Sequence, residues 1–118
     1  KLDIRCGRPR QPGDFRWEGI AFLAASGSNI QAIHAGKVVF ADWFRGKGLL
    51  LIIDHGNGYM TLYAHNQTLL KKTGDTVRAG DNIATLGNSG GLTRPELYFE
   101  LRHQGQPVNP TLWLSKNG

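Results

Sequence analysis

The stretch Pro95–Arg102 (PELYFELR) decides the fold that we expect. Successive side chains of an extended chain point to opposite faces of a sheet, so Leu97, Phe99 and Leu101 share one apolar face. The polar residues that alternate with them share the other face: Glu96, Tyr98, Glu100 and Arg102. We therefore predict a strand with one face in the hydrophobic core and the other face at a functional site.

The clearest turn signal outside this strand is Asn57-Gly58. Both residue types adopt positive φ readily, which the two-residue turn of a β-hairpin requires. The flanking runs, Leu49–Asp54 and Tyr59–Ala64, are rich in aliphatic and aromatic residues. We predict that these two runs form a hairpin.

Further β-rich runs separated by glycines precede and follow this hairpin: Leu2–Cys6, Trp17–Ala25, Ile30–Ala35, Lys37–Trp43 and Gly74–Gly87. Gln67–Val77 contains several threonines and a glycine, which favour a loop with one helical turn over a helix. Asn88–Gly91 is typical of a flexible loop, and Gly105-Gln106 of a hairpin turn. We expect Leu112, Trp113 and Leu114 to anchor the C-terminal end on the core.

Parallel strands need crossover helices, and no helix longer than about eight residues is indicated. The predicted fold class is therefore all-β: a small, mostly antiparallel β-sheet, either a sheet packed as a β-sandwich or a partly closed barrel. With 118 residues, 40% of them hydrophobic and 19% charged, the chain is expected to form a single domain over residues 1–118.

The net charge of +5 suits an anionic partner. The basic residues are scattered and lack a nucleic-acid-binding motif, so we expect no nucleic-acid partner. No apolar stretch reaches the ~20 residues that span a bilayer, and we expect no direct membrane insertion. The only cysteine, Cys6, has no partner for an internal disulfide.

Four segments, in this order, resemble the LytM or M23 family of cell-wall zinc endopeptidases: Arg16–Phe22, Tyr63–His65, Thr76–Asp81, and Leu97–Arg102 followed by Val108–Pro110. The resemblance covers nearly the whole chain. It implies a LytM-type β fold with long loops around a groove. It also implies a C-terminal effector domain of a longer protein, with the first strand of the family cut short at Lys1.

Active members of this family carry H-x-G-x-D early and H-x-H late, and these motifs supply the zinc ligands. Carried over by position, the three ligands fall on Trp17, Ala21 and Tyr98. Glu96 stands where the first histidine of the late pair belongs, and only His65, in a Y-x-H segment, matches a catalytic residue.

A hydrolytic zinc site needs about three protein ligands and an open position for water. Tryptophan and alanine side chains offer no lone pair, and a neutral tyrosine is a poor ligand. We therefore expect no metal, no cofactor and no catalytic residue. His65 is interpreted as a relic that still forms a hydrogen bond in the groove; a metal-free acid–base pair of His65 and Glu96 stays open as the alternative. We interpret His34, His55 and His103 as surface or turn histidines.

Within the family, the resemblance is strongest to division-associated members with degenerate metal positions, and it rests on Ala41-Asp42-Trp43, Gly90-Gly91, Arg94-Pro95, Leu97–Glu100, Gln104–Gln106 and Val108–Pro110. It implies a non-catalytic regulator in the Gram-negative periplasm, at the division septum. Such a regulator binds and activates N-acetylmuramoyl-L-alanine amidases for the splitting of septal peptidoglycan. An upstream coiled coil, outside these residues, is implied to dock on an ABC-transporter-like division complex.

We expect the emptied groove to bind a segment of the amidase through the residues around the lost site: Trp17, Glu18, Ala21, Lys47, Tyr63, His65, Glu96, Tyr98 and Arg102. Lys47 and Arg102 are expected to steer an acidic partner segment. Two alternatives stay open. One is a zinc-dependent peptidoglycan endopeptidase with unrecognised ligands, and the other is a peptidoglycan-binding module in which Trp17 stacks on a sugar.

Overall fold

The computed structural model describes residues 3–5 and 20–109, with side-chain surroundings from residue 24 onward. Ten strands lie in this part of the chain: β1 (Asp3–Arg5), β2 (Ile20–Leu23), β3 (Asn29–Gln31), β4 (Gly36–Phe44), β5 (Gly48–Gly56), β6 (Tyr59–Leu69), β7 (Thr76–Val77), β8 (Asn82–Leu86), β9 (Leu97–His103) and β10 (Gln106–Val108). All their pairings are antiparallel. The predicted all-β, antiparallel fold class is confirmed.

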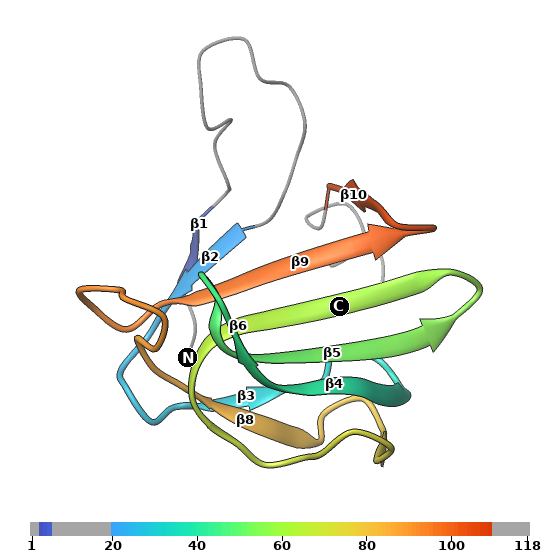
Figure 1. Cartoon of the computed structure of the whole chain (residues 1–118), viewed down its shortest axis with the longest axis horizontal. Helices are drawn as coiled ribbons and strands as arrows, with labels where there is room; N and C mark the ends of the chain where they lie inside the picture. The colour runs from blue at the N-terminus through green and yellow to red at the C-terminus, as the bar shows by residue number, and fades with distance from the viewer. Residues whose placement is uncertain (1–2, 6–19, 110–118) are drawn as a thin grey trace, which may run out of the picture.

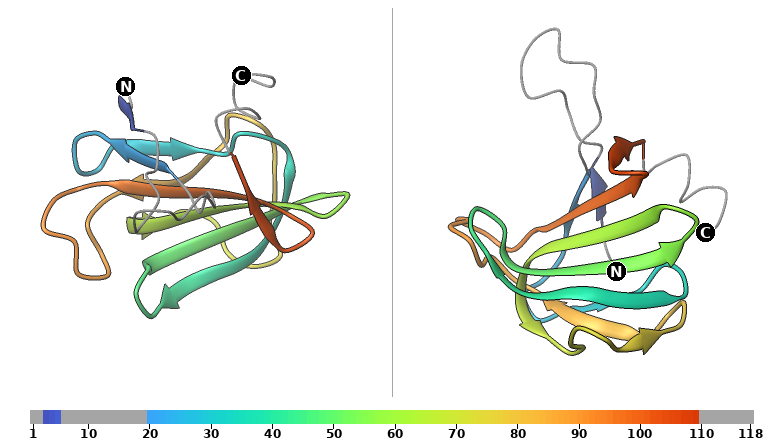
Figure 2. Two further views of the ribbon diagram at one scale, coloured as in Figure 1. Left: turned by 90° about the horizontal axis from the view of Figure 1, so that it is seen from above. Right: turned by 45° about the vertical axis from the view of Figure 1, so that its right-hand side comes forward.

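The main path of the sheet runs β1-β2-β9-β6-β5-β4-β7, with β10 on β9 and β3 on β8 (Figure 1). β8 also pairs with β6, so the sheet curls and β3 and β8 lie behind its central strands, as the turned view in Figure 2 shows. Apolar side chains fill the space inside the curl, including Leu51 and Ile53 of β5, Leu86 of β8 and Phe99 of β9. The core therefore lies on one face of the central strands and leaves their other face for a site.

β6 is the strand that makes the curl possible. Its first half, Tyr59–Ala64, pairs with β9, and its second half, from Asn66 to Leu69, pairs with β8. His65 lies between the halves with φ +67, a left-handed conformation that non-glycine residues seldom adopt. β6 thus exchanges its pairing partner β9 for β8 at His65, which is a candidate site residue.

The hairpin predicted at Asn57-Gly58 is confirmed. These residues join β5 to β6 with φ values of 55 and 83, the two positive values that a type I′ turn needs. The hairpin turn predicted at Gly105-Gln106 lies one residue earlier: Gln104 and Gly105 have φ values of 53 and 81, and Gln106 already belongs to β10. The strand predicted over Pro95–Arg102 spans Leu97–His103.

The helical turn predicted within Gln67–Val77 is wrong. β6 continues as a strand to Leu69 because Thr68 and Leu69 pair with Thr85 and Ala84 of β8. The following turn is held by Asp75, which accepts a hydrogen bond from the backbone N–H of Lys72 at 2.9 Å. Pairing in the folded sheet overrides the weak local preference of this segment.

Several predictions lie outside the described residues: those for Cys6, Trp17, Glu18, Leu112, Trp113 and Leu114. Over residues 3–5 and 20–109, no helix is long and apolar enough to cross a membrane.

Candidate functional site

β9 separates the core from the candidate site as its alternation predicts. Leu97, Phe99 and Leu101 are buried in the core, with exposed fractions of 3%, 1% and 1%. On the other face Tyr98 pairs with Ala21 of β2 and Ala64 of β6, while Glu100 pairs with Leu62 and Arg102 with Met60. We call this face of the central strands the site face: Tyr98, Glu100, Arg102, Met60, Leu62, Ala64, Ile52 of β5 and Phe40 of β4.

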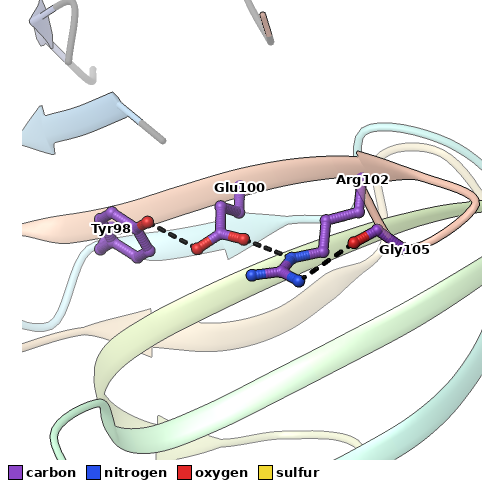
Figure 3. A network of polar contacts seen from close by, with 4 residues as sticks. All are labelled: Tyr98, Glu100, Arg102 and Gly105. Atoms are coloured by element: carbon purple, nitrogen blue, oxygen red, sulfur yellow. Dashed lines mark hydrogen bonds and ion pairs between the residues drawn. The ribbon is translucent and has the colours of Figure 1, made fainter. Parts of the chain in front are cut away.

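A polar network runs along β9 on the site face (Figure 3). Glu100 is only 2% exposed, and its carboxylate accepts hydrogen bonds from the Tyr98 hydroxyl and from Arg102 Nε, both at 2.5 Å. Arg102 also donates to the Gly105 carbonyl at 3.4 Å. A buried carboxylate needs such partners, so Glu100 has its hydrogen bonds and the charge of Arg102 is compensated inside the domain.

Lys47 brings a second cation to this face. It follows a tight turn in which its own N–H bonds to the Phe44 carbonyl at 2.9 Å. Its Nζ lies 4.1 Å from the centroid of the Tyr98 ring, in a cation–π contact. Within the described residues Lys47 has no carboxylate partner, unlike Arg102.

His65 approaches Tyr98 from β6. Its side chain is 8% exposed, and the two ring centroids lie 6.4 Å apart at an interplanar angle of 68°. Nδ1 lies 2.7 Å from the Ser89 carbonyl oxygen, which can only accept a hydrogen bond. A neutral ring held in this way therefore carries its hydrogen on Nδ1 and leaves Nε2 as an acceptor.

The structure brings together four of the predicted site residues: Lys47, His65, Tyr98 and Arg102. The backbone of Ala21 lies beside Tyr98. Glu96 precedes β9 and is partly exposed; its N–H donates to the Gly87 carbonyl at 3.0 Å. No hydrogen bond links the Glu96 side chain to His65 in the described residues.

The placement of Tyr63 in the groove is wrong, because Tyr63 lies in the core. It is 1% exposed, its ring packs edge-on against Phe99 at 5.4 Å, and its hydroxyl lies 2.9 Å from Thr61 Oγ1. Burial raises the pKa of Tyr63 to about 12. In a regular strand, residues 63 and 65 would share a face; the positive φ of His65 breaks the alternation and separates the two side chains.

The site face has an apolar half, formed by Phe40, Ile52 and Leu62, that was not predicted from the sequence. Phe40, Ile52 and Leu62 pair in register across β4, β5 and β6, and Leu62 pairs in turn with Glu100. Phe44 and Met60 extend this half, and they are 50% and 37% exposed. The run Leu49–Asp54 is apolar on both faces and gives no sign of which residues leave the core; only the alternation of Tyr59–Ala64 contains a signal for Met60 and Leu62.

The described side chains at this face do not fit a zinc ion. No three His, Cys, Asp or Glu side chains gather closely enough among the described residues to hold a metal. Tyr98 is engaged with Glu100, and the Lys47 ammonium group beside it would repel a second cation. This face can instead present aromatic, apolar and cationic groups to another molecule.

Three comparisons with known proteins agree with the geometry. The model of the family described as Peptidase family M23 matches residues 15–110. The murein hydrolase activator EnvC of Escherichia coli (strain K12) is 49% identical over 104 residues, which cover 88% of this chain and 25% of EnvC. The murein hydrolase activator NlpD of the same organism is 41% identical over 98 residues, 82% of this chain and 26% of NlpD.

Among solved structures, the antimicrobial peptidase lysostaphin from Staphylococcus simulans superposes with a TM-score of 0.87 at 27% identity, covering 99% of this chain and 50% of that one. The chain spans about a quarter of the length of EnvC and NlpD. Because the family match extends over most of its length, the chain belongs to peptidase family M23.

Proposed function

We propose that this chain is the regulatory domain of a murein hydrolase activator. It binds a periplasmic N-acetylmuramoyl-L-alanine amidase through the site face and activates it without cleaving peptidoglycan itself. The names of EnvC and NlpD support this assignment. The observation that carries it is the pair Lys47 and Tyr98, a cation on an aromatic ring at the strand position where the family resemblance puts a zinc ligand.

The partner segment has an acidic and an apolar part. Lys47 is the cation of the site face without a carboxylate among the described residues, so it is the group that receives an acidic side chain. Arg102 is already paired with Glu100 and serves chiefly to hold the network. The exposed Phe44 ring and the exposed Met60 side chain offer apolar contact to the same partner segment.

Binding has to change the amidase to activate it. We propose that the bound segment is one that occludes the amidase in its resting state. The site face then stabilises the open state by differential binding, which is the only way a ligand shifts such an equilibrium.

The decisive experiment mixes the purified chain and a purified amidase with labelled peptidoglycan, alone and together, with and without added zinc. Label should be released when both proteins are present and not by the chain alone. Zinc-dependent release by the chain alone would contradict the proposal and favour an endopeptidase. Sedimentation of the chain with cell wall, followed by failure to stimulate the amidase, would favour a peptidoglycan-binding module.

Two variants locate the interface. Tyr98→Ala and Lys47→Ala should each weaken amidase binding by about 1–3 kcal/mol if both groups are hot spots. The matched control is Lys72→Ala, which removes one positive charge from a side chain that is 86% exposed and pairs only with Asp75 among the described residues. Equal weakening by Lys47→Ala and Lys72→Ala would reduce the Lys47 effect to net charge.

The proposal includes a place in the cell and a larger protein. The chain acts at the cell envelope, in the periplasm at the division septum, as the C-terminal effector domain of a longer chain. An upstream coiled coil docks that protein on an ABC-transporter-like complex. A fluorescent fusion of the full-length protein should mark the division site, and an even distribution around the cell would remove the septal part of the proposal.

A further inference from the structure

The loop between β8 and β9 contains a residue that braces the two segments behind the site face. Ser89 Oγ donates a hydrogen bond to the Asn66 carbonyl at 2.6 Å and accepts one from the Leu49 N–H at 3.0 Å. Its own carbonyl accepts from His65 Nδ1 at 2.7 Å. One residue thus contacts the beginning of β5 and the bend of β6 together.

The approach of this loop to β5 leaves no room for side chains. A Cβ on Gly48 would lie 2.4 Å from Ser89 Oγ, and a Cβ on Gly90 would lie 2.5 Å from the Gly48 nitrogen. Both glycines have positive φ, at 68 and 85, which glycine adopts without strain. The backbone segments are therefore packed directly on each other around the serine.

The residues that Ser89 braces are chain neighbours of the two polar groups at the site face. Lys47 directly precedes Gly48, and His65 directly precedes Asn66. The two are also joined to each other, since the His65 N–H donates to the Lys47 carbonyl at 2.8 Å. A shift of the brace would move both side chains relative to Tyr98.

We propose that Ser89 is a positioning residue for the site face: its hydroxyl holds the β6 bend against β5, and this fixes where His65 Nε2 and the Lys47 ammonium group stand beside Tyr98. The inference rests on the proposed function, because the amidase segment is the molecule that would bind His65 Nε2 and the Lys47 ammonium group. It adds that Ser89, in the β8–β9 loop and not among the predicted site residues, controls the geometry of the docking surface.

The first test uses the free chain and needs no amidase. In ¹⁵N NMR spectra at alkaline pH, where imidazole rings are neutral, His65 should show a single tautomer with the hydrogen on Nδ1, because the Ser89 carbonyl accepts from that atom. A wild-type spectrum with the hydrogen mainly on Nε2 would overturn the proposal, whatever any variant does.

The second test compares Ser89→Ala with Ser28→Ala. Ser28 Oγ makes an equally short bond, 2.6 Å to the Ala25 carbonyl, in an exposed turn on another part of the chain. Ser89→Ala should give a mixture of His65 tautomers and weaken amidase binding about two- to tenfold, the range that loss of a hydrogen bond usually produces. Ser28→Ala should leave both readouts unchanged.

The two tests separate the inference from the function on which it rests. A folded Ser89→Ala chain with the wild-type His65 spectrum overturns the positioning role. A wild-type chain that fails to stimulate any amidase overturns the proposed function, while the His65 spectrum still decides whether Ser89 fixes the ring.

Discussion

His55 on β5 and His65 on β6 direct Nδ1 at a backbone carbonyl in the same way, 2.8 Å from Ala35 and 2.7 Å from Ser89. They differ at the other ring nitrogen. His55 Nε2 lies 2.7 Å from Thr61 Oγ1, whereas His65 Nε2 has no hydrogen-bond partner in the described residues and its ring faces Tyr98.

The second nitrogen connects His55 to the interior. Thr61 is fully buried and its hydroxyl lies within hydrogen-bond distance, 2.9 Å, of the Tyr63 hydroxyl, which also accepts from the Ile33 N–H at 3.5 Å. His55 is therefore the outer end of a buried polar chain and not the simple turn or surface residue that was predicted. His34, whose ring lies 5.7 Å away, is exposed as expected.

Residue type and a shared backbone anchor therefore do not assign a role to a histidine. In His55 both nitrogens are bonded within the domain, so its side chain supports the fold. In His65 one nitrogen is bonded within the domain, so the other can meet a partner.

The largest difference should appear in amidase stimulation. His65→Ala removes a group at the site face and should weaken amidase binding about 10- to 100-fold if it is a hot spot. His55→Ala should leave binding nearly unchanged when both variants are compared at a temperature where they are folded. Equal losses, measured by titration of the amidase with each variant, would erase the distinction.

The order should reverse for stability. His55→Ala leaves the buried Thr61 hydroxyl without one of its partners and should lower the free energy of unfolding by about 1–3 kcal/mol. His65→Ala removes one bond to a loop carbonyl and should cost less, about 1 kcal/mol. Urea unfolding followed by tryptophan fluorescence measures both values, and a costlier His65→Ala would contradict the assignment.

Tyr63→Phe should have a smaller effect. It removes the hydroxyl at the inner end of the His55 chain but keeps the ring against Phe99, so the free energy of unfolding should fall by about 0.5–1.5 kcal/mol. Amidase stimulation should not change, because the ring lies in the core. Loss of stimulation in a stable Tyr63→Phe chain would return Tyr63 to the interface.

The smallest effect should be a dependence of stability on pH. Burial lowers the pKa of His55 below its ordinary value of 6.5, and nearby His34 lowers it further, against the opposing effects of the Ala35 carbonyl and Asp54. Below pH 6.5 the unfolded chain therefore binds more protons than the folded chain, and the stability that neutral His55 contributes is lost as the pH falls.

This effect is isolated by a difference measurement. The free energy of unfolding of the wild type minus that of His55→Gln should shrink between pH 7.5 and pH 5, because the other histidines titrate in both chains. A difference that grows toward acid pH would mean that the folded state favours protonated His55, contrary to its buried surroundings.

Much of the fold could be predicted because its signals are local. The alternation in Pro95–Arg102 and the turn at Asn57-Gly58 each depend on residues that are neighbours in the chain. The extension of β6 to Leu69 was not predicted, because it depends on pairing with β8 and the residues next to Leu69 in the chain contain no signal for that pairing.

The site was predicted in part for the same reason. Tyr98 and Arg102 follow from the alternation of β9, and Lys47 was predicted as a residue near the positions that the family resemblance assigns to zinc ligands. The buried position of Tyr63 and the bracing role of Ser89 were not visible in the sequence. Both follow from the bend at His65, which turns two residues of one motif to opposite faces.

An antiparallel β domain follows from the amino-acid sequence alone, because alternation and turn chemistry act over a few residues. The sequence also determined that tyrosine and alanine stand where the family resemblance puts zinc ligands. The folded chain adds the contacts that these positions make: Lys47 on the Tyr98 ring, Glu100 between Tyr98 and Arg102, and His65 with one nitrogen left for a partner. These contacts join residues from separate strands and loops, and the left-handed bend at His65 that makes some of them possible is held by the Ser89 loop, far away in the chain.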